Sequence, residues 1–184
     1  MASVSDLRSV LACTPKDPRF SDFLAAQLGI SDALSQVAPK AFSDCVYFSW
    51  PSSGVSFVFD CVAPYKPRTG PTSLAELQLD SLRLSAIDLY HQAPPDASSP
   101  PSKGRSKAKT TSSSSTTVFS TCAKVLPLSF DGSSLSLSTE TTAKDMVEAL
   151  GEPDAKGGGS VVPIWLEWVC SSSPLYRHLI ILTC

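Results

Sequence analysis

The chain has 184 residues, 42% of them hydrophobic, and a formal net charge of −2 at pH 7. This length suits one sizeable domain or two small ones, and the charge gives no general attraction to nucleic acid or membranes. No run of 18 apolar residues occurs, which argues against a transmembrane segment. Asp6 and Arg8 lie where a signal peptide would be apolar, so we expect a cytoplasmic or nuclear protein.

The six cysteines are scattered, and no two of them form a C-x-x-C pair. A zinc site would need closer pairs, and only two histidines are present to help. A disulfide framework is not expected in a chain of this length without a secretion signal. We therefore expect free thiols that pack as small hydrophobes, and neither a metal nor a cofactor. The cysteines are Cys13, Cys45, Cys61, Cys122, Cys170 and Cys184.

The first part of the chain carries two helical patterns. Asp17 followed by Pro18 is typical of a helix start, because aspartate caps free amides and proline suits the first turn. Apolar residues at helical spacing follow and Gly29 ends the run, which predicts a helix over residues 18–28. A brief amphipathic pattern over residues 4–13 predicts a further short helix near the terminus.

Strand patterns come next. Residues 45–50 and 55–61 are rich in aromatic and β-branched side chains, and the turn residues 51–54 separate them. This arrangement predicts a β-hairpin with a four-residue loop. Residues 82–90 predict another strand, whose clearest part is the segment Ile-Asp-Leu-Tyr at 87–90.

Residues 91–117 change in character. The stretch 98–117 holds twelve serines or threonines and no large apolar side chain, so it cannot bury enough surface to offset its ordering entropy. We expect a disordered linker. Its basic residues are not opposed by acids, which leaves open nucleic-acid or anionic-lipid binding, although the lack of interleaved aromatic residues disfavours nucleic acid. These candidate contacts are Lys103, Arg105, Lys107 and Lys109.

After the linker, residues 118–130 and 134–137 predict strands, and residues 142–150 predict a helix. Thr142 is a good N-cap, and Asp145 resembles the acidic partner of a capping box. Gly151 follows directly after the apolar stripe, where a left-handed residue commonly ends a helix. At about two turns this helix must dock on another element to be stable.

A glycine-rich segment follows the helix. Lys156, Gly157, Gly158 and Gly159 predict a mobile loop, because each glycine loses much backbone freedom on ordering. A lysine beside glycines could bind phosphate, but the Gly-Lys-Ser/Thr that opens the helix of a P-loop is missing. A flexible connection is the favoured interpretation, and a small-ligand or hydrolytic site is the alternative.

The last part of the chain predicts two strands. In residues 164–168 the alternation puts Leu166 and Trp168 on one face and Trp165 on the other. An outward Trp165 is the candidate contact residue, and the alternative is that this second face of the strand is covered as well. The apolar residues 178–182 are expected to close a hairpin with 164–168.

The pattern as a whole predicts an α+β fold with antiparallel sheet and a few short helices. Residues 1–90 form a first half and residues 118–184 a second half, packed as one domain, with the linker 91–117 between them. Each half reads as a capped helix followed by an aromatic hairpin, so the two halves are candidates for an internal repeat.

Residues 42–90 also carry a resemblance. Their aromatic hairpin and the two strand segments after it resemble part of the eukaryotic phagophore assembly factor family. Membership would imply a non-enzymatic adaptor that works with a larger partner at autophagic membranes, and it assigns no site residue. The segments that carry it are VYF at 46–48, GVSFVF at 54–59, LQL at 77–79 and IDLY at 87–90.

No catalytic set emerges from the sequence. His91 borders the linker, where a base would be poorly held, and His178 lies in an apolar strand. Neither G-x-S-x-G nor H-E-x-x-H occurs. We therefore expect no catalytic residues, and a non-enzymatic adaptor or scaffold that binds an unidentified protein partner. Ligand binding at 156–159 and binding through the basic linker are the alternatives.

Overall fold

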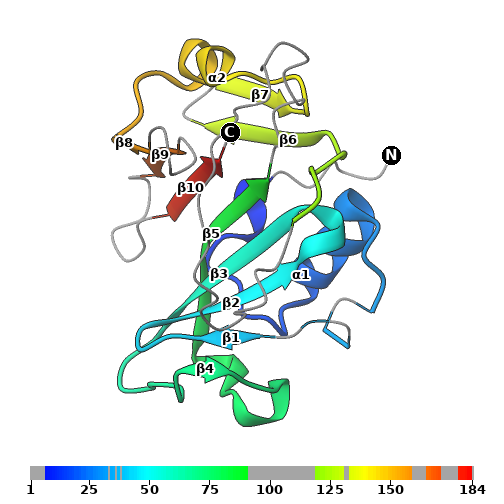
Figure 1. The fold of residues 1–184 in the computed structure, drawn as a ribbon, viewed down its shortest axis with the longest axis vertical. Helices are drawn as coiled ribbons and strands as arrows, with labels where there is room; N and C mark the ends of the chain where they lie inside the picture. Colours follow the sequence, from blue (N-terminus) through cyan, green and yellow to red (C-terminus); the bar gives the residue numbers. More distant parts are fainter. Residues whose placement is uncertain are drawn as a thin grey trace, which may run out of the picture.

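A computed structural model describes most of the chain outside the linker (Figure 1). Its architecture is mixed α+β and mostly sheet, as the sequence predicts. None of the helices in the described residues is both long and apolar enough to cross a bilayer. The described residues are 7–32, 34–35, 37, 39–90, 119–130, 133–158, 165–170 and 178–183.

One eight-stranded sheet runs through both halves, in the order β4-β1-β2-β3-β5-β10-β9-β8. All neighbouring pairs are antiparallel except β5 and β10, which are parallel. A separate hairpin joins β6 and β7. The strands are β1 (Lys40–Ala41), β2 (Cys45–Trp50), β3 (Val55–Cys61), β4 (Gly70–Pro71), β5 (Leu82–Tyr90), β6 (Leu126–Phe130), β7 (Ser133–Leu137), β8 (Ala155–Gly157), β9 (Trp165–Cys170) and β10 (His178–Thr183).

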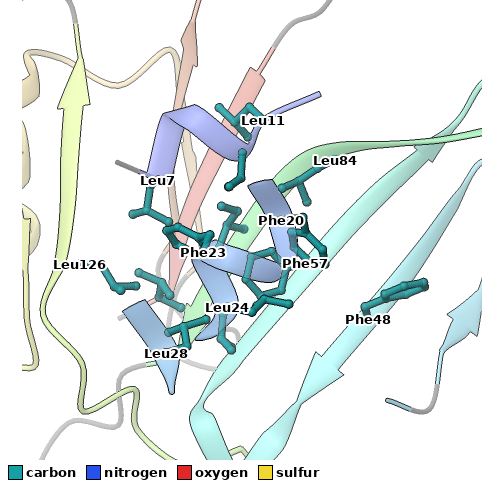
Figure 2. Close-up of a cluster of buried hydrophobic side chains, with 14 of the residues drawn as sticks. Leu7, Leu11, Phe20, Phe23, Leu24, Leu28, Phe48, Phe57, Leu84 and Leu126 are labelled. Carbon is teal, nitrogen blue, oxygen red and sulfur yellow. The ribbon is translucent and has the colours of Figure 1, made fainter. Parts of the chain in front are cut away.

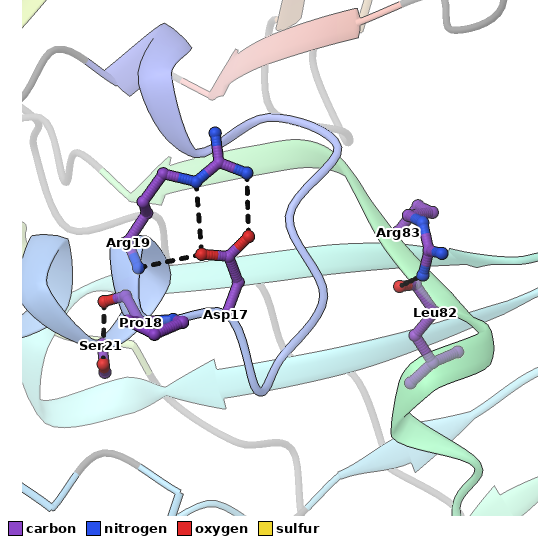
Figure 3. Close-up of polar contacts among 6 residues, drawn as sticks. All are labelled: Asp17, Pro18, Arg19, Ser21, Leu82 and Arg83. Atoms are coloured by element: carbon purple, nitrogen blue, oxygen red, sulfur yellow. Dashed lines mark hydrogen bonds and ion pairs between the residues drawn. The ribbon is translucent and has the colours of Figure 1, made fainter.

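The helix α1 (Pro18–Phe23) begins as the sequence predicts. Asp17 accepts a hydrogen bond from the amide of Arg19 at 3.0 Å, and its carboxylate also pairs with that residue's guanidinium at 2.8 Å (Figure 3). Residues Leu24–Leu28 continue α1 as a wider π-type turn, η2, which ends at the left-handed Gly29. The predicted helix over 18–28 is therefore present, but its second half changes pitch.

The helix α2 (Ala143–Leu150) also has the predicted ends. The Thr142 hydroxyl and the Asp145 carboxylate form a reciprocal capping box, and Gly151 ends the helix at φ 84°. The expected helix over residues 4–13 is only a short 3₁₀ turn, η1, in the described part of that range. The 3₁₀ turns are η1 (Leu7–Val10), η3 (Pro51–Ser53), η4 (Leu74–Glu76) and η5 (Leu79–Ser81).

The core lies between the sheet and the helical segments (Figure 2). Phe20 of α1 meets Phe57 edge-on with ring centroids 5.1 Å apart, and Phe23 meets the same ring at 6.4 Å. Trp50 completes the contact from β2 at 5.6 Å. These rings are buried, and edge-to-face pairs of this kind stabilise a core beyond their area burial. We call this side of the sheet the core face.

The strand β5 contains a bulge that changes which of its residues enter the core. Val58 pairs with Ala86 and Phe59 pairs with Leu84, so Ser85 has no direct partner and forms a bulge. As a result Leu84 and Ile87 both enter the core although they are three residues apart. The opposite side of the sheet, which we call the second face, receives the alternate residues of each strand.

The C-terminal strand pairs as predicted. The antiparallel register of β9 and β10 runs from Cys170 opposite His178 to Trp165 opposite Thr183. On its other side β10 joins β5 in parallel, so both halves share one sheet. The two halves contain a helix and a hairpin in the same order, but this order does not test a common origin, and the internal repeat stays a prediction.

The chain returns from the undescribed residues 91–118 beside the point where it left the sheet. The Cys122 amide donates to the Tyr90 carbonyl at 2.8 Å, and the Phe119 ring stacks on the Tyr90 ring at 3.8 Å. This returning segment passes so close to Gly54 that a Cβ there would overlap the backbone of Ser120 and Cys122. The expected disorder of 91–117 falls outside the described residues.

Because the returning segment passes so close to Gly54, we expect that adding one methyl group there lowers the stability of the fold strongly. Gly54→Ala would add left-handed strain of about 1–2 kcal/mol, and displacing the crossing backbone adds about 1–3 kcal/mol. Gly29→Ala is the matched control, because Gly29 has a similar φ of 69° and only the Lys124 amine near the added carbon. Urea denaturation should show the larger loss for Gly54→Ala. Equal losses of unfolding free energy in the two variants would contradict the close passage of the Ser120–Cys122 backbone over Gly54.

Candidate functional site

The second face carries polar and aromatic side chains in register across the sheet. Paired residues of adjacent strands point to the same side, so one row runs from Ser49 through Ser56 and Asp88 to Glu167. Ile181 of β10 occupies the position between the two acids. These pairings place the candidate site on the middle of the sheet.

A second row runs beside the first one. Tyr90 pairs with Thr183, which pairs with Trp165, which pairs with Gly157. The aromatic residues Tyr90 and Trp165 therefore lie on the same side of the sheet, two strands apart. Both are half-buried. The second face thus presents aromatic rings beside the row of hydroxyls and carboxylates.

Five residues of these strands form what we call the Asp88 cluster: Tyr47, Ser49, Ser56, Asp88 and Tyr90. The Ser49 and Ser56 hydroxyls are 2.8 Å apart and hydrogen-bonded. Ser56 is fully buried, and Asp88 is 9% exposed. The Ser56 hydroxyl also lowers the pKa of the Tyr90 phenol, so the two groups lie close together. The cluster is therefore a polar group of side chains with a largely buried centre.

Burial raises the pKa of Asp88 to about 6, and no described group offsets this effect by a hydrogen bond. The pKa of Tyr47 is raised first by its own burial and then by the Asp88 charge. The pKa of Tyr90 is raised by burial as well. A carboxyl that titrates near neutrality inside a polar cluster is a common property of functional sites.

Two basic side chains described on this face, those of Lys40 and Arg83, are engaged elsewhere. The Lys40 amine lies 5.3 Å from the centroid of the Phe42 ring. Arg83 lies opposite Asp60, and its guanidinium donates to the carbonyl of Asp80 at 2.7 Å. It also donates to the carbonyl of Leu82 at 2.8 Å (Figure 3). These bonds hold the arginine at the start of β5, at the far end of the strand from Tyr90. Its charge therefore does not form a salt bridge with Asp88.

Trp165 is held in a fixed position at the outer end of the sheet. A Cβ on Gly157 would lie 2.5–2.7 Å from three atoms of the Trp165 indole, so the ring lies directly on the glycine backbone. Leu166 and Trp168 enter the core, and the Trp168 indole donates to the Gly151 carbonyl at 3.0 Å. The predicted alternation of this strand is confirmed for these residues.

The expected loop at residues 156–159 needs correction. Ala155–Gly157 is the edge strand β8, because the Trp165 ring covers the glycine and the pairing with β9 satisfies its backbone. The Lys156 amine lies 4.0 Å from the Glu152 carboxylate on the surface. Gly158 follows the strand with φ 100°. Gly159 lies outside the described residues, as do the linker contacts Lys103, Arg105, Lys107 and Lys109.

Cys13, Cys45, Cys61 and Cys122 are free thiols. Burial raises the pKa of Cys13 and of Cys45 to about 11, and it also raises the pKa of Cys61. Such thiols stay protonated at neutral pH and are weak nucleophiles. Within the described residues, no group of three potential metal ligands comes together.

Sequence reasoning did not single out Asp88. The available signal was a carboxylate between Ile87 and Leu89 in a strand that is otherwise apolar at that end. Alternation alone assigns such a residue to a solvated face. Its burial depends on the neighbouring strands, which place Tyr47 and Ser56 beside it.

Comparisons with known proteins assign no family. No family model matches the chain, and no curated protein or solved structure matches it significantly. The resemblance of residues 42–90 to phagophore assembly factors therefore stays a prediction.

The raised pKa of Asp88 predicts a pH dependence of stability. The folded-state pKa of about 6 lies above the ordinary value of 3.8, so the native state binds more protons than the unfolded state between these values. The contribution of Asp88 to the free energy of unfolding should therefore fall as pH rises from about 4 to 6 and should stay low above pH 6. Asp88→Asn should therefore be more stable than the natural chain by roughly 2–3 kcal/mol at pH 8 and about equal to it at pH 4.

The measurement is urea denaturation of both chains at several pH values. Asp17→Asn is a control of opposite sign, because the hydrogen bond from the Arg19 guanidinium lowers the pKa of Asp17 to about 2. The stabilisation from Asp17 is present above its ordinary pKa and is lost as pH falls toward 2. A stability difference for Asp88→Asn that does not change with pH would contradict the assignment.

Fluorescence quenching tests the placement of Trp165. Trp50 is 5% exposed and Trp168 is 1% exposed, whereas Trp165 is half-buried. Acrylamide should therefore quench mainly the emission of Trp165. Trp165→Phe should remove most of the quenchable signal, and Gly157→Ala should increase quenching, because the added methyl group displaces the ring. Equal quenching in the natural chain and Trp165→Phe would contradict this placement.

Proposed function

We propose that the chain is an intracellular, non-enzymatic interaction module that binds a protein partner on the second face of its sheet. The observation that carries the proposal is the Trp165 ring lying on Gly157. A tryptophan that is already fixed loses little conformational entropy on binding. Tryptophan is also the residue type most enriched at the energetic centres of protein interfaces.

The neighbourhood of Trp165 suits such a contact. Glu167 is half-buried on the same side of β9, and Tyr90 lies two strands away in the same row as Trp165. Aromatic rings next to hydroxyls and carboxylates can provide both apolar area and hydrogen-bond specificity. The strand β8 ends the described sheet, so its outer edge is also in position to pair with an extended partner segment.

The thiols do not favour an enzymatic role. Cys13, Cys45 and Cys61 all have raised pKa values, so the described cysteines with resolved shifts are the opposite of activated nucleophiles. Within the Asp88 cluster, the residues beside the carboxyl carry tyrosine and serine hydroxyls. This composition suits recognition of a bound group.

Affinity capture with the full chain tests the proposal. Trp165→Ala and Trp165→Asp should reduce retention of a stoichiometric protein partner at least tenfold, whereas Trp165→Phe should retain most of the binding. Val125→Ala is the matched surface control, because Val125 is 60% exposed and is not part of the second face. Circular dichroism should show that every variant is folded. Undiminished retention by folded Trp165→Ala and Trp165→Asp would refute this contact.

A further inference from the structure

We infer that the Asp88 cluster binds one organic cation, the ammonium or guanidinium group of a lysine or arginine on the partner. This inference rests on the proposed function, because it assumes a partner on the second face. It adds the chemistry of the recognised group. The argument starts from the burial of one carboxyl and from the side chains around it.

The carboxyl is placed where its charge has little compensation. Asp88 sits in the middle of the sheet, between Ser56 on β3 and Ile181 on β10, with 9% of its surface exposed. The hydroxyls of Ser49 and Ser56 bond one another, and Ser56 lies close to the Tyr90 phenol. Burial is the cause of the raised pKa of Asp88, with no hydrogen bond from these hydroxyls to offset it. A buried carboxylate in this situation is stabilised by a proton or by a cation.

The aromatic side chains select the kind of cation. The Asp88 charge contributes to the raised pKa of Tyr47 on β2 and of Tyr90 on β5, so both tyrosines lie near the carboxyl. Phe119 stacks on the Tyr90 ring with an angle of 15° between the planes, and this contact fixes that ring. Aromatic faces attract organic cations, and the attraction is greater when the cation is desolvated.

A metal ion fits the same position poorly. Calcium takes six to eight oxygen ligands, and magnesium requires a nearly regular octahedron. Asp88 is the only carboxylate in the cluster, and the next acid along the row, Glu167, lies two strands away, which is about 10 Å at the usual strand spacing. One carboxylate between two tyrosines matches an alkylammonium or guanidinium group better than a hard divalent ion.

The charge of the chain favours a basic partner. Residues 98–117 carry four positive charges and no acid, so the rest of the chain has a net charge of −6 when the total is −2. The carboxylates on the second face include Asp60, Asp88 and Glu167. Its basic residues include Lys40, whose amine lies over the Phe42 ring, and Arg83, which is bonded to backbone carbonyls. This distribution attracts a lysine-rich or arginine-rich segment and repels phosphates.

The test uses n-butylammonium chloride and n-butylguanidinium chloride as probes of the lysine and arginine side chains. Each is titrated into the full chain at pH 7.5 and constant ionic strength, and binding is followed by amide NMR. We expect saturable shifts at millimolar concentration, centred on the Asp88 cluster. 1-Butanol is the neutral control with the same alkyl chain. Butanol should not produce these shifts, and equal shifts from butanol would overturn the inference.

Asp88→Asn is the decisive variant, because it keeps the size of the side chain and removes its charge. It should lose the saturable shifts from both cations. Affinity in the natural chain should fall about tenfold between pH 7.5 and pH 5, because a carboxyl with a pKa of about 6 is then mostly protonated. Titrations that are the same in Asp88→Asn and the natural chain would overturn the inference, as would the absence of any saturable shift.

The inference and the proposed function fail in different ways. Cation binding that requires Asp88, together with partner retention that does not require Trp165, would refute the partner contact and leave the cation site standing. Partner retention that requires Trp165, together with equal cation titrations in Asp88→Asn and the natural chain, would refute only the cation site. Trp165→Ala should leave the butylammonium titration unchanged, because Trp165 lies two strands from Tyr90.

Discussion

The backbone pairing of β5 is the constraint on which the rest of the structure depends. This strand pairs antiparallel with β3 and parallel with β10, and so it joins the N-terminal hairpin to the C-terminal one. A bulge at Ser85 lets Leu84 and Ile87 both reach the core on one side. Beyond Ile87, the alternation of side chains along β5 directs Asp88 and Tyr90 to the opposite face of the sheet. The strand β5 therefore contributes residues to the core on one side and to the candidate site on the other.

The second face follows from that arrangement. Because β2, β3 and β5 pair in fixed register, Tyr47, Ser56 and Asp88 are brought together from three strands. The pairing of β10 with β9 extends the same rows to Glu167 and Trp165. The returning segment at Phe119 then fixes the Tyr90 ring. The second face and the core therefore depend on the same strand pairings. Pre-ordered aromatic side chains are what a binding face would require.

The sequence predicted those features whose signals are local. The capped helix ends at Asp17 and Thr142 and the hairpin at residues 45–61 are set by turn and capping chemistry within a few residues. The pairing of β5 with β10 joins residues that are far apart in the chain, and alternation does not specify which strands become neighbours. Gly157 was expected in a loop because its intrinsic preference is weak, and the cross-strand contact with Trp165 outweighs that preference. Asp88 was missed because its burial depends on neighbouring strands.

Native-state hydrogen exchange along β5 tests the central claim most directly. The Tyr90 amide donates to Gly54 on the β3 side at 3.0 Å, so alternation directs the amides of Ile87 and Leu89 toward β10. We expect the Ile87 and Leu89 amides to be as strongly protected as those of Asp88 and Tyr90, with all four exchanging only through global unfolding. Fast exchange at Ile87 and Leu89 beside slow exchange at Asp88 and Tyr90 would show that β10 does not pair with β5. The continuous sheet and its second face would then be wrong.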